Sequence, residues 1–177
     1  MRITTERLTL EPISLHHLES TFAYSSDPEN TRLMMFLPYE SIEETEVCIR
    51  KSMEYWQSDA PEHLQFAVIL NGAQIGDVTM YMAGPGNAEL GWILDKGCQG
   101  HGYATEAVRA VMDYGKREWG IRRFFAMCDS ENAPSYRLME RLGMRRMPQT
   151  GKRKNRSSDE ERLEIVYEIF ENTAQYG

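Results

Sequence analysis

Cysteine is scarce in this chain of 177 residues, which has three in all. Cys48, Cys98 and Cys128 are far apart, odd in number and outside any spacing typical of a disulfide framework or a zinc site. Histidine is sparse too, and the four histidines form no HExxH motif or similar pair, which leaves metal catalysis without support. We therefore expect a reduced intracellular protein with no bound metal.

Long apolar runs are absent as well. The N-terminus, with Arg2, Glu6 and Arg7 among its first residues, lacks the apolar stretch of a signal peptide. No other segment approaches the ~18 apolar residues of a membrane span. These absences predict a soluble protein in the cytoplasm with no membrane partner.

Basic residues are outnumbered, because 20 Lys and Arg face 27 Asp and Glu, for a net charge of −7 and a pI near 5.2. Binding to nucleic-acid phosphates needs a broad basic surface, so we expect no nucleic-acid partner. The negative charge is compatible with a cationic acceptor such as an amine, although many cytosolic enzymes are as acidic. The length suits a single domain over residues 1–177, and no repeat or linker divides it.

Apolar periodicity predicts a mixture of strands and helices along the chain. In chain order these are a strand at 8–13, helices from Ser14 and from Ser41, strands at 64–70, 74–82 and 88–94, a helix at 104–119, a strand at 123–128, a helix at 134–142 and a strand at 163–170. Residues 27–39 are expected to form a loop or broken helix. The basic run 152–156 and the acidic residues after it predict a solvated hairpin loop, with contact to an anionic ligand as the alternative.

A glycine-rich segment separates the third middle strand from the helix at 104–119. Gly100 and Gly102 let the backbone turn tightly and present successive N–H groups, and the helix N-terminus adds partial positive charge. The segment therefore either cradles a phosphate or is an ordinary strand-to-helix connection. It does not fit a dinucleotide fingerprint, because Thr105 stands where a third glycine or alanine is needed, and it lacks the Lys-[Ser/Thr] ending of a P-loop.

The spacing of Gln99, Gly102 and Ala104 resembles the Gln/Arg-x-x-Gly-x-Gly/Ala motif of the GCN5-related N-acetyltransferase superfamily, whose loop grips the diphosphate of acetyl-CoA. Other segments are similar to the branch with the ribosomal-protein alanine and serine N-acetyltransferases, namely 5–10, 26–29, 100–107, 132–135 and 140–144. The resemblance runs from about Thr4 to Met144, with the final strand beyond. It is specific to the superfamily and weak on the acceptor.

The resemblance implies an α+β fold with a mixed central sheet of about six to seven strands and about four helices. In that fold the strands before and after the 104–119 helix lie parallel and splay apart, so that the pantetheine arm of acetyl-CoA inserts between them. It also implies acetyl-CoA as the acetyl donor, without a metal. The residues implied in binding it are Trp92, Ile93, Leu94, Gln99, Gly100, His101, Gly102, Tyr103, Ala104, Thr105, Asn132 and Ser135.

Acetyl transfer to an amine requires an unprotonated amine and, at the end, a proton for the leaving thiolate. Glu89 lies ten positions before Gln99, where some members of the superfamily keep a carboxylate base, and burial would raise its pKa toward a useful value. The alternative for Glu89 is a charge on the strand surface. Asn132 is either a helix N-cap, a contact to the cofactor, or both.

The tyrosine that commonly protonates the thiolate in the superfamily falls at Met139 here. Methionine cannot donate a proton, so the role passes to Ser135, to Tyr136, to another residue or to water, and we favour Ser135. A covalent acetyl-enzyme on Cys98 or Cys128 is disfavoured, because the resemblance implies direct transfer in a ternary complex.

The leading functional hypothesis is an acetyl-CoA-dependent N-acetyltransferase that acts by direct transfer in a ternary complex. Its acceptor is a primary amine, either a protein N-terminus or a small amine such as a polyamine, an amino acid or an aminoglycoside. Two alternatives remain: an acetyl-CoA-binding sensor or interaction module without turnover, and a nucleotide-binding regulatory domain. The exposed late strands also offer an edge for a homodimer.

Overall fold

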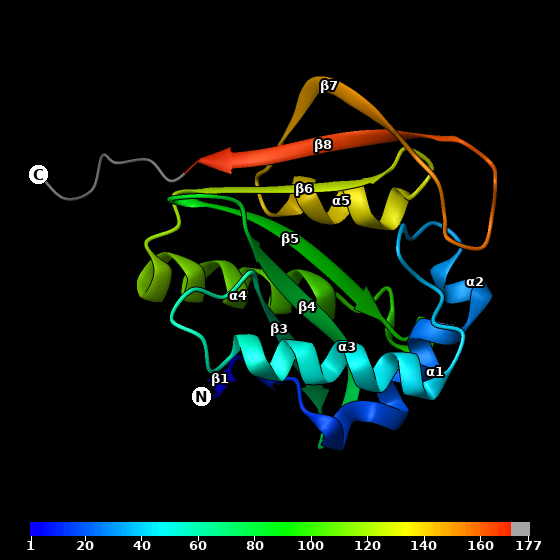
Figure 1. The fold of residues 1–177 in the computed structure, drawn as a ribbon. Coiled ribbons are helices and arrows are strands. Elements are labelled where there is room, and N and C mark those ends of the chain that lie inside the picture. The colour runs from blue at the N-terminus through cyan, green and yellow to red at the C-terminus, as the bar shows by residue number, and fades with distance from the viewer. Residues whose placement is uncertain (171–177) are drawn as a thin grey trace, which may run out of the picture.

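A computed structural model describes residues 1–170 of the protein. Its centre is an eight-stranded sheet of order β1-β2-β3-β4-β5-β6-β8-β7 (Figure 1). The strands are β1 (Ile3–Thr4), β2 (Leu8–Pro12), β3 (His63–Leu70), β4 (Ala73–Met82), β5 (Asn87–Leu94), β6 (Arg123–Asp129), β7 (Arg145–Arg153) and β8 (Arg162–Phe170). The helices are α1 (Leu18–Ser26), α2 (Pro28–Thr31), α3 (Ile42–Tyr55), α4 (Tyr103–Trp119) and α5 (Ala133–Arg141), with 3-10 turns η1 (Leu15–His17) and η2 (Lys96–Cys98).

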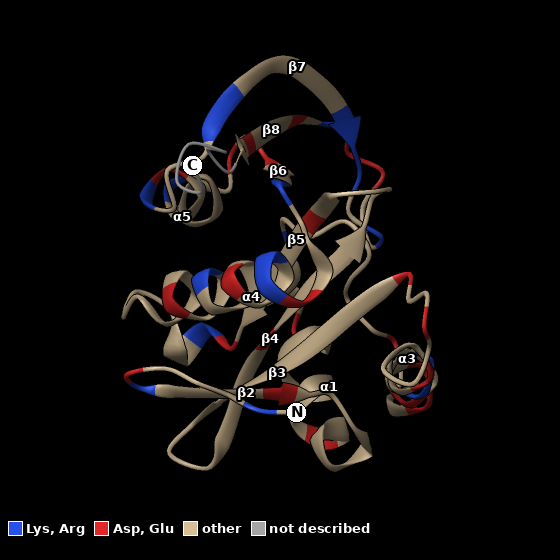
Figure 2. Cartoon of the chain, turned by 90° about the vertical axis from the view of Figure 1, so that its left-hand side faces the viewer, with Lys and Arg blue, Asp and Glu red and all other residues tan. Residues whose placement is uncertain are grey.

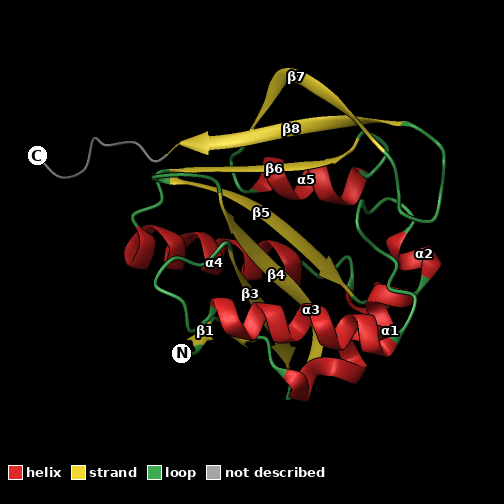
Figure 3. Cartoon of the chain, viewed as in Figure 1, coloured by secondary structure: helices red, strands yellow, loops and turns green. Residues whose placement is uncertain are grey.

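Helices lie on both faces of the sheet (Figure 3). Helix α4 packs on β2, β4 and β5, and its apolar stripe, with Val108 and Val111, is buried against Val78 and Met80. Helices α1 and α3 lie on the opposite face, over β4 and β3. Since side chains alternate along a strand, Asp77 and the other odd-numbered residues of this part of β4 face α1 and α3. No helix within residues 1–170 is long and apolar enough to cross a membrane.

Strands β5 and β6 form the parallel pair that the resemblance predicted. They pair over one short stretch, where Asn87 to Glu89 lie opposite Arg123 to Phe125. Beyond it Trp92 and its neighbours keep their partners in β4 but have none in β6 within the described chain. The pair therefore splays apart, as expected, and leaves backbone groups of β5 without a neighbouring strand.

The eight strands are more than the expected six to seven, and two of them, β1 and β7, were not assigned from the sequence. β1 has two residues, too few for any periodic signal, and pairs with β2 through Ile3 and Thr4. β7 is largely exposed and rich in Arg, Lys and Gln, so it lacks the alternation by which a strand is recognised. It pairs with β8 and basic residues mark both its ends (Figure 2). The helix count is also higher than four, because the segment after α1 contains the short helix α2.

The basic run 152–156 was predicted to lie in a solvated hairpin loop, but its first two residues end β7, only 154–156 lie in the connection to β8, and the run is not fully solvated. The side chain of Arg153 is 8% exposed and Asn155 is buried. The amide Nδ2 of Asn155 donates to the carbonyl oxygens of Thr31 (2.8 Å), Met34 (2.6 Å) and Leu37 (3.2 Å). Because these acceptors lie more than a hundred positions earlier, periodicity within the hairpin does not reveal the burial.

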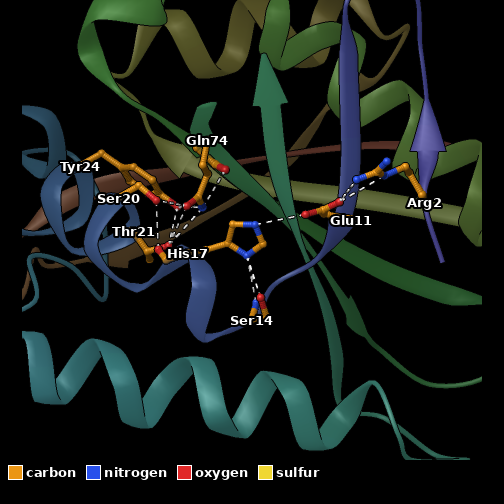
Figure 4. A network of polar contacts seen from close by, with 9 residues as sticks. Arg2, Glu11, Ser14, His17, Ser20, Thr21, Tyr24 and Gln74 are labelled. Carbon is orange, nitrogen blue, oxygen red and sulfur yellow. Dashed lines mark hydrogen bonds and ion pairs between the residues drawn. The ribbon is translucent and has the colours of Figure 1, made fainter. Parts of the chain in front are cut away.

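A polar network fixes α1 to the sheet (Figure 4). The hydroxyl of Tyr24 donates to Asp77 Oδ2 at 2.7 Å, and Gln74 Nε2 donates to Tyr24 Oη at 3.0 Å and to Thr21 Oγ1 at 3.1 Å. Past the helix, Asn30 Nδ2 donates to the carbonyl oxygen of Leu94 at 3.1 Å. The network therefore holds the segment after α1 beside the end of β5, next to the glycine-rich loop.

Candidate active site

The glycine-rich loop turns sharply into α4. Gly100 and Gly102 have φ angles of 81° and 82°, in the left-handed region that favours glycine, and Gly102 is the N-cap of α4 without a side-chain cap. Within residues 1–170 the backbone N–H groups from Gly100 to Thr105 donate to no protein acceptor. Together with the positive end of the helix, they form a site suited to an anion such as a diphosphate.

The loop is supported by Arg7, from the turn between β1 and β2, together with Glu106 of α4. The Glu106 carboxylate accepts hydrogen bonds from Thr5 Oγ1 (2.6 Å), Arg7 N (2.9 Å) and Arg7 Nε (2.7 Å). Burial alone would raise the pKa of Glu106, but these hydrogen bonds hold it below its usual value. Arg7 Nη1 in turn donates to the carbonyl oxygen of His101 at 3.0 Å. Sequence reasoning missed this support, although both residues lie in segments that carried the resemblance.

A cavity of about 940 Å³ opens beside the loop. It extends from α4 to the end of β5 and to the N-terminus of α5. All the residues implied in cofactor binding line it: Trp92, Ile93, Leu94, Gln99, Gly100, His101, Gly102, Tyr103, Ala104, Thr105, Asn132 and Ser135. Periodicity did not single out Leu33, Met34, Arg32, Arg137 and Arg141, which line it as well. The three arginines add cations to a cradle otherwise made of backbone groups.

Gln99 has a structural partner within the loop. Its Nε2 donates to Asn30 Oδ1 at 3.0 Å and to the carbonyl oxygen of Leu94 at 3.2 Å. The side chain thereby joins the loop to β5 and to the segment after α1. Gln99 lines the cavity, and its side chain holds the glycine-rich loop in place.

The N-terminus of α5 brings Asn132 and Ser135 to the cavity. Asn132 Oδ1 accepts from the backbone N–H of Ser135 at 3.3 Å, so Asn132 is the helix N-cap, and no described residue accepts from its Nδ2. The Ser135 hydroxyl has no hydrogen bond within residues 1–170. Tyr136 instead packs against the hydrophobic core and lines no described cavity, and Met139 is buried there.

A second, smaller cavity of about 60 Å³ adjoins the first where β5 and β6 diverge. It shares Trp92, Asn132 and Ser135 with the larger cavity, and Arg153 lines it from the β7 and β8 hairpin. Cys128 also lines it, but burial raises the pKa of its thiol to about 12. Burial also raises the pKa of Cys98, in the larger cavity. A protonated thiol is a poor nucleophile, which disfavours a covalent acetyl-enzyme.

Glu89 lies on β5 at the last residue paired with β6, opposite Phe125. It is half-buried and lines neither cavity. Burial raises the pKa of its carboxyl above the usual value, the charge of Glu164 raises it further, and Arg153 opposes the shift. Glu89 is thus a carboxyl with the perturbed acidity of a proton acceptor, on the side of the sheet not covered by α4.

A family model described as an acetyltransferase (GNAT) domain matches residues 7–145. The chain belongs to the GNAT acetyltransferase family. This enzyme is 34% identical over 152 residues to the uncharacterized N-acetyltransferase YnaD of Bacillus subtilis (strain 168), in a match that covers 82% of this chain and 84% of YnaD. The superfamily inferred from the glycine-rich motif is therefore confirmed, and the protein is an N-acetyltransferase.

Solved structures agree on the fold of this acetyltransferase. It is similar to a GNAT-family acetyltransferase from Bacillus anthracis, with 30% identity and a TM-score of 0.81 over 96% of this chain and 98% of that one. It also shares the fold of RimL, a ribosomal L7/L12 α-N-protein acetyltransferase in complex with coenzyme A. That match has 18% identity and a TM-score of 0.81, over 96% of this chain and 98% of RimL.

Proposed function

We propose that this acetyltransferase moves the acetyl group of acetyl-CoA to a primary amine by direct transfer in a ternary complex. The acceptor is a protein N-terminus or a small amine such as a polyamine, an amino acid or an aminoglycoside. The observation that carries the proposal is the run of unpaired backbone N–H groups from Gly100 to Thr105 within the described residues. They open on a cavity of about 940 Å³ that continues to the free edge of β5.

The residues present fit such a donor. The cradle supplies hydrogen bonds and the helix end to a diphosphate, and Arg32, Arg137 and Arg141 add positive charge at the cavity wall. The edge of β5 around Trp92, which has no neighbouring strand in the described chain, offers hydrogen bonds to an extended chain of amides lying along β5. When bound, acetyl-CoA supplies the activated thioester, and RimL, with the same fold, binds coenzyme A.

In this mechanism the proton transfers belong to Glu89 and Ser135. Glu89 takes the proton that the acceptor amine loses, directly or through water, and its raised pKa makes it a better base than an exposed glutamate. The Ser135 hydroxyl, at the N-terminus of α5, donates to the leaving sulfur and is recharged from solvent. Asn132, beside Ser135 at the same cavity, orients the cofactor or an ordered water.

A thiol-release assay with acetyl-CoA and a panel of amines tests the function, and calorimetry measures acetyl-CoA binding directly. We expect acetyl-CoA to bind and coenzyme A to be released only when an acceptor is present. Binding without turnover across the panel would instead favour a cofactor-sensing module. The proposal is refuted if the protein does not bind acetyl-CoA and releases no coenzyme A with any amine of the panel.

A further inference from the structure

Arg153 is an arginine with a largely covered side chain and unused hydrogen-bond donors. Its side chain is 8% exposed, and its nearest partner is Glu164, with Nη1 at 3.6 Å from Oε2, which is too long for a hydrogen bond. Within residues 1–170 its guanidinium makes no hydrogen bond. Because a guanidinium carries five N–H donors and none of them bonds to the described protein, the side chain can bind an anion that enters the cavity it lines.

The anion that Arg153 could reach is defined by the small cavity. The cavity is small, at about 60 Å³, and suits a compact polar group such as a carboxylate. The planar fork of a guanidinium matches a carboxylate through two parallel hydrogen bonds. Asn132 and Ser135 line the same cavity, so a carboxylate held here lies beside the place where the proposed transfer occurs.

The charges around Arg153 indicate which molecule carries the carboxylate. Glu89 and Arg153 interact electrostatically across this side of the sheet, and Glu164 takes part in the same cluster. An amine that gives its proton to Glu89 is therefore close to Arg153. A polyamine would bring a second cation toward the guanidinium, whereas a zwitterion sets its positive group at Glu89 and its negative group at Arg153.

We propose that the acceptor of this acetyltransferase carries a carboxylate next to its amine, as a free α-amino acid does, and that Arg153 binds this carboxylate. The inference rests on the proposed function and narrows its list of amines. A protein N-terminus is followed by a neutral amide, which offers Arg153 no charge beyond that of Glu164. Arg153 is thus a specificity residue of the acceptor pocket.

The test compares L-amino acids with their α-amides, and with spermidine, in the acetyl-CoA thiol-release assay. We expect kcat/KM of the wild type to be at least about tenfold higher for an amino acid than for its amide, because a charge-assisted pair is lost in the amide. Arg153→Gln should abolish this preference by lowering the value for the amino acid alone, and Arg153→Lys should restore part of it. The KM for acetyl-CoA should stay within about twofold.

Arg156→Gln is the matched control, because Arg156 lies on the same hairpin but pairs with Glu44 and lines neither cavity. It should keep the preference for amino acids. Since Arg153→Gln leaves Glu164 unpaired, the double variant Arg153→Gln/Glu164→Gln removes both charges, and thermal melting checks that each variant folds. The double variant should also lack the preference for amino acids.

Four results would overturn the inference. In the first, the wild type prefers amides or spermidine. In the second and third, Arg153→Gln either loses activity equally toward amino acids and amides or keeps the preference for the carboxylate. In the fourth, the enzyme prefers succinyl-CoA to acetyl-CoA and this preference depends on Arg153. The last would assign the carboxylate to the acyl group. If acetyl-CoA binds but no acceptor is acetylated, calorimetry can compare the binding of amino acids and of their amides to the complex of the enzyme with coenzyme A. Equal affinity for the two would refute the inference. Failure to bind acetyl-CoA would instead refute the proposed function.

Discussion

The side-chain amide of Asn155 donates to the carbonyl oxygen of Met34 at 2.6 Å, across 121 positions of sequence. Met34 lines both cavities, so this contact joins the β7 and β8 hairpin to a wall of the site (Figure 1). The same amide nitrogen binds Thr31 and Leu37, and Asn155 Oδ1 accepts from the N–H of Ser157 at 2.9 Å. The hairpin and the segment after α2 are therefore held together by one buried side chain.

Asn155→Ala should lower the free energy of unfolding by roughly 2 kcal/mol, because one buried and two partly buried carbonyl groups lose a donor. It should also raise the KM for the acceptor, since Met34 is released from the cavity wall. Asn155→Asp should be worse, because it sets a carboxylate against those carbonyls. Urea unfolding and steady-state kinetics measure both effects. Asn87→Ala is the control, as Asn87 donates to Pro85 in an exposed turn, and an equal effect there would contradict the prediction.

Gly102→Val should raise the dissociation constant of acetyl-CoA strongly. A β-branched side chain is strained at a φ of 82° and would stand among the N–H groups of the cradle. Gly84→Val is the matched control, because Gly84 has a similar φ of 89° in the turn between β4 and β5 and lines neither cavity. Both variants should lose comparable stability, but calorimetry should find weaker acetyl-CoA binding in Gly102→Val alone. Equal affinity in the two would remove the diphosphate from this loop.

The sequence predicts much of this architecture because its signals are local. The helix at 104–119 has an apolar stripe and a glycine at each end, and the structure has α4 at Tyr103–Trp119. The hairpin at Asn71 and the splayed pair also follow, the first from turn chemistry and the second from the family resemblance. β7 does not, because its exposed polar residues form a strand through pairing with β8 rather than through their own pattern.

Some residues of the candidate site could likewise be predicted from the sequence, and others could not. The cradle residues are consecutive, so a motif finds them, and each lines the large cavity. Arg7, Asn155 and Arg153 act on partners about a hundred residues away or in another segment, and no spacing rule connects them. Arg153 was visible as part of a basic run, but the fold alone shows that its side chain is largely covered while Lys154 beside it is exposed. Long-range partners of this kind require the three-dimensional structure.

Asp77→Asn should remove part of the pH dependence of the free energy of unfolding. Burial raises the pKa of Asp77 to about 6, from 3.8 for an unperturbed aspartate, despite the hydrogen bond from Tyr24. A carboxyl group whose pKa is higher in the folded than in the unfolded state contributes its full stabilisation at pH values below the unfolded-state pKa. This stabilisation is lost as the pH rises through the folded-state pKa. Between about pH 4 and about pH 6, the wild type should therefore lose stability relative to Asp77→Asn by roughly 1.4 kcal/mol for each pH unit.

Urea unfolding of the two proteins over this pH range measures the difference directly. The exposed Asp113, which pairs with Lys116 on α4, provides the control. The stability of Asp113→Asn should follow that of the wild type at a constant offset. Parallel curves for Asp77→Asn and the wild type would show that Asp77 does not titrate in this range.

Glu89→Gln should lower kcat/KM by about 10² to 10⁴-fold near neutral pH, as expected when a general base is lost. In the wild type kcat/KM should rise with pH through the pKa of Glu89, which lies above the usual value because the carboxyl is half-buried and near Glu164. The variant should lack this rise, since glutamine does not titrate. Arg153→Gln should move the rise to higher pH, because Arg153 favours the charged form of Glu89.

Glu168→Gln is a suitable control for Glu89, because Glu168 lies on β8, pairs with Arg123 at 2.7 Å and lines neither cavity. Its pH profile should match that of the wild type. If Glu89→Gln keeps the wild-type profile, Glu89 is not the proton acceptor. If Glu89→Gln loses activity equally at every pH, Glu89 shapes the acceptor pocket without taking the proton. A loss confined to the pH range above its pKa is the result that identifies Glu89 as the base.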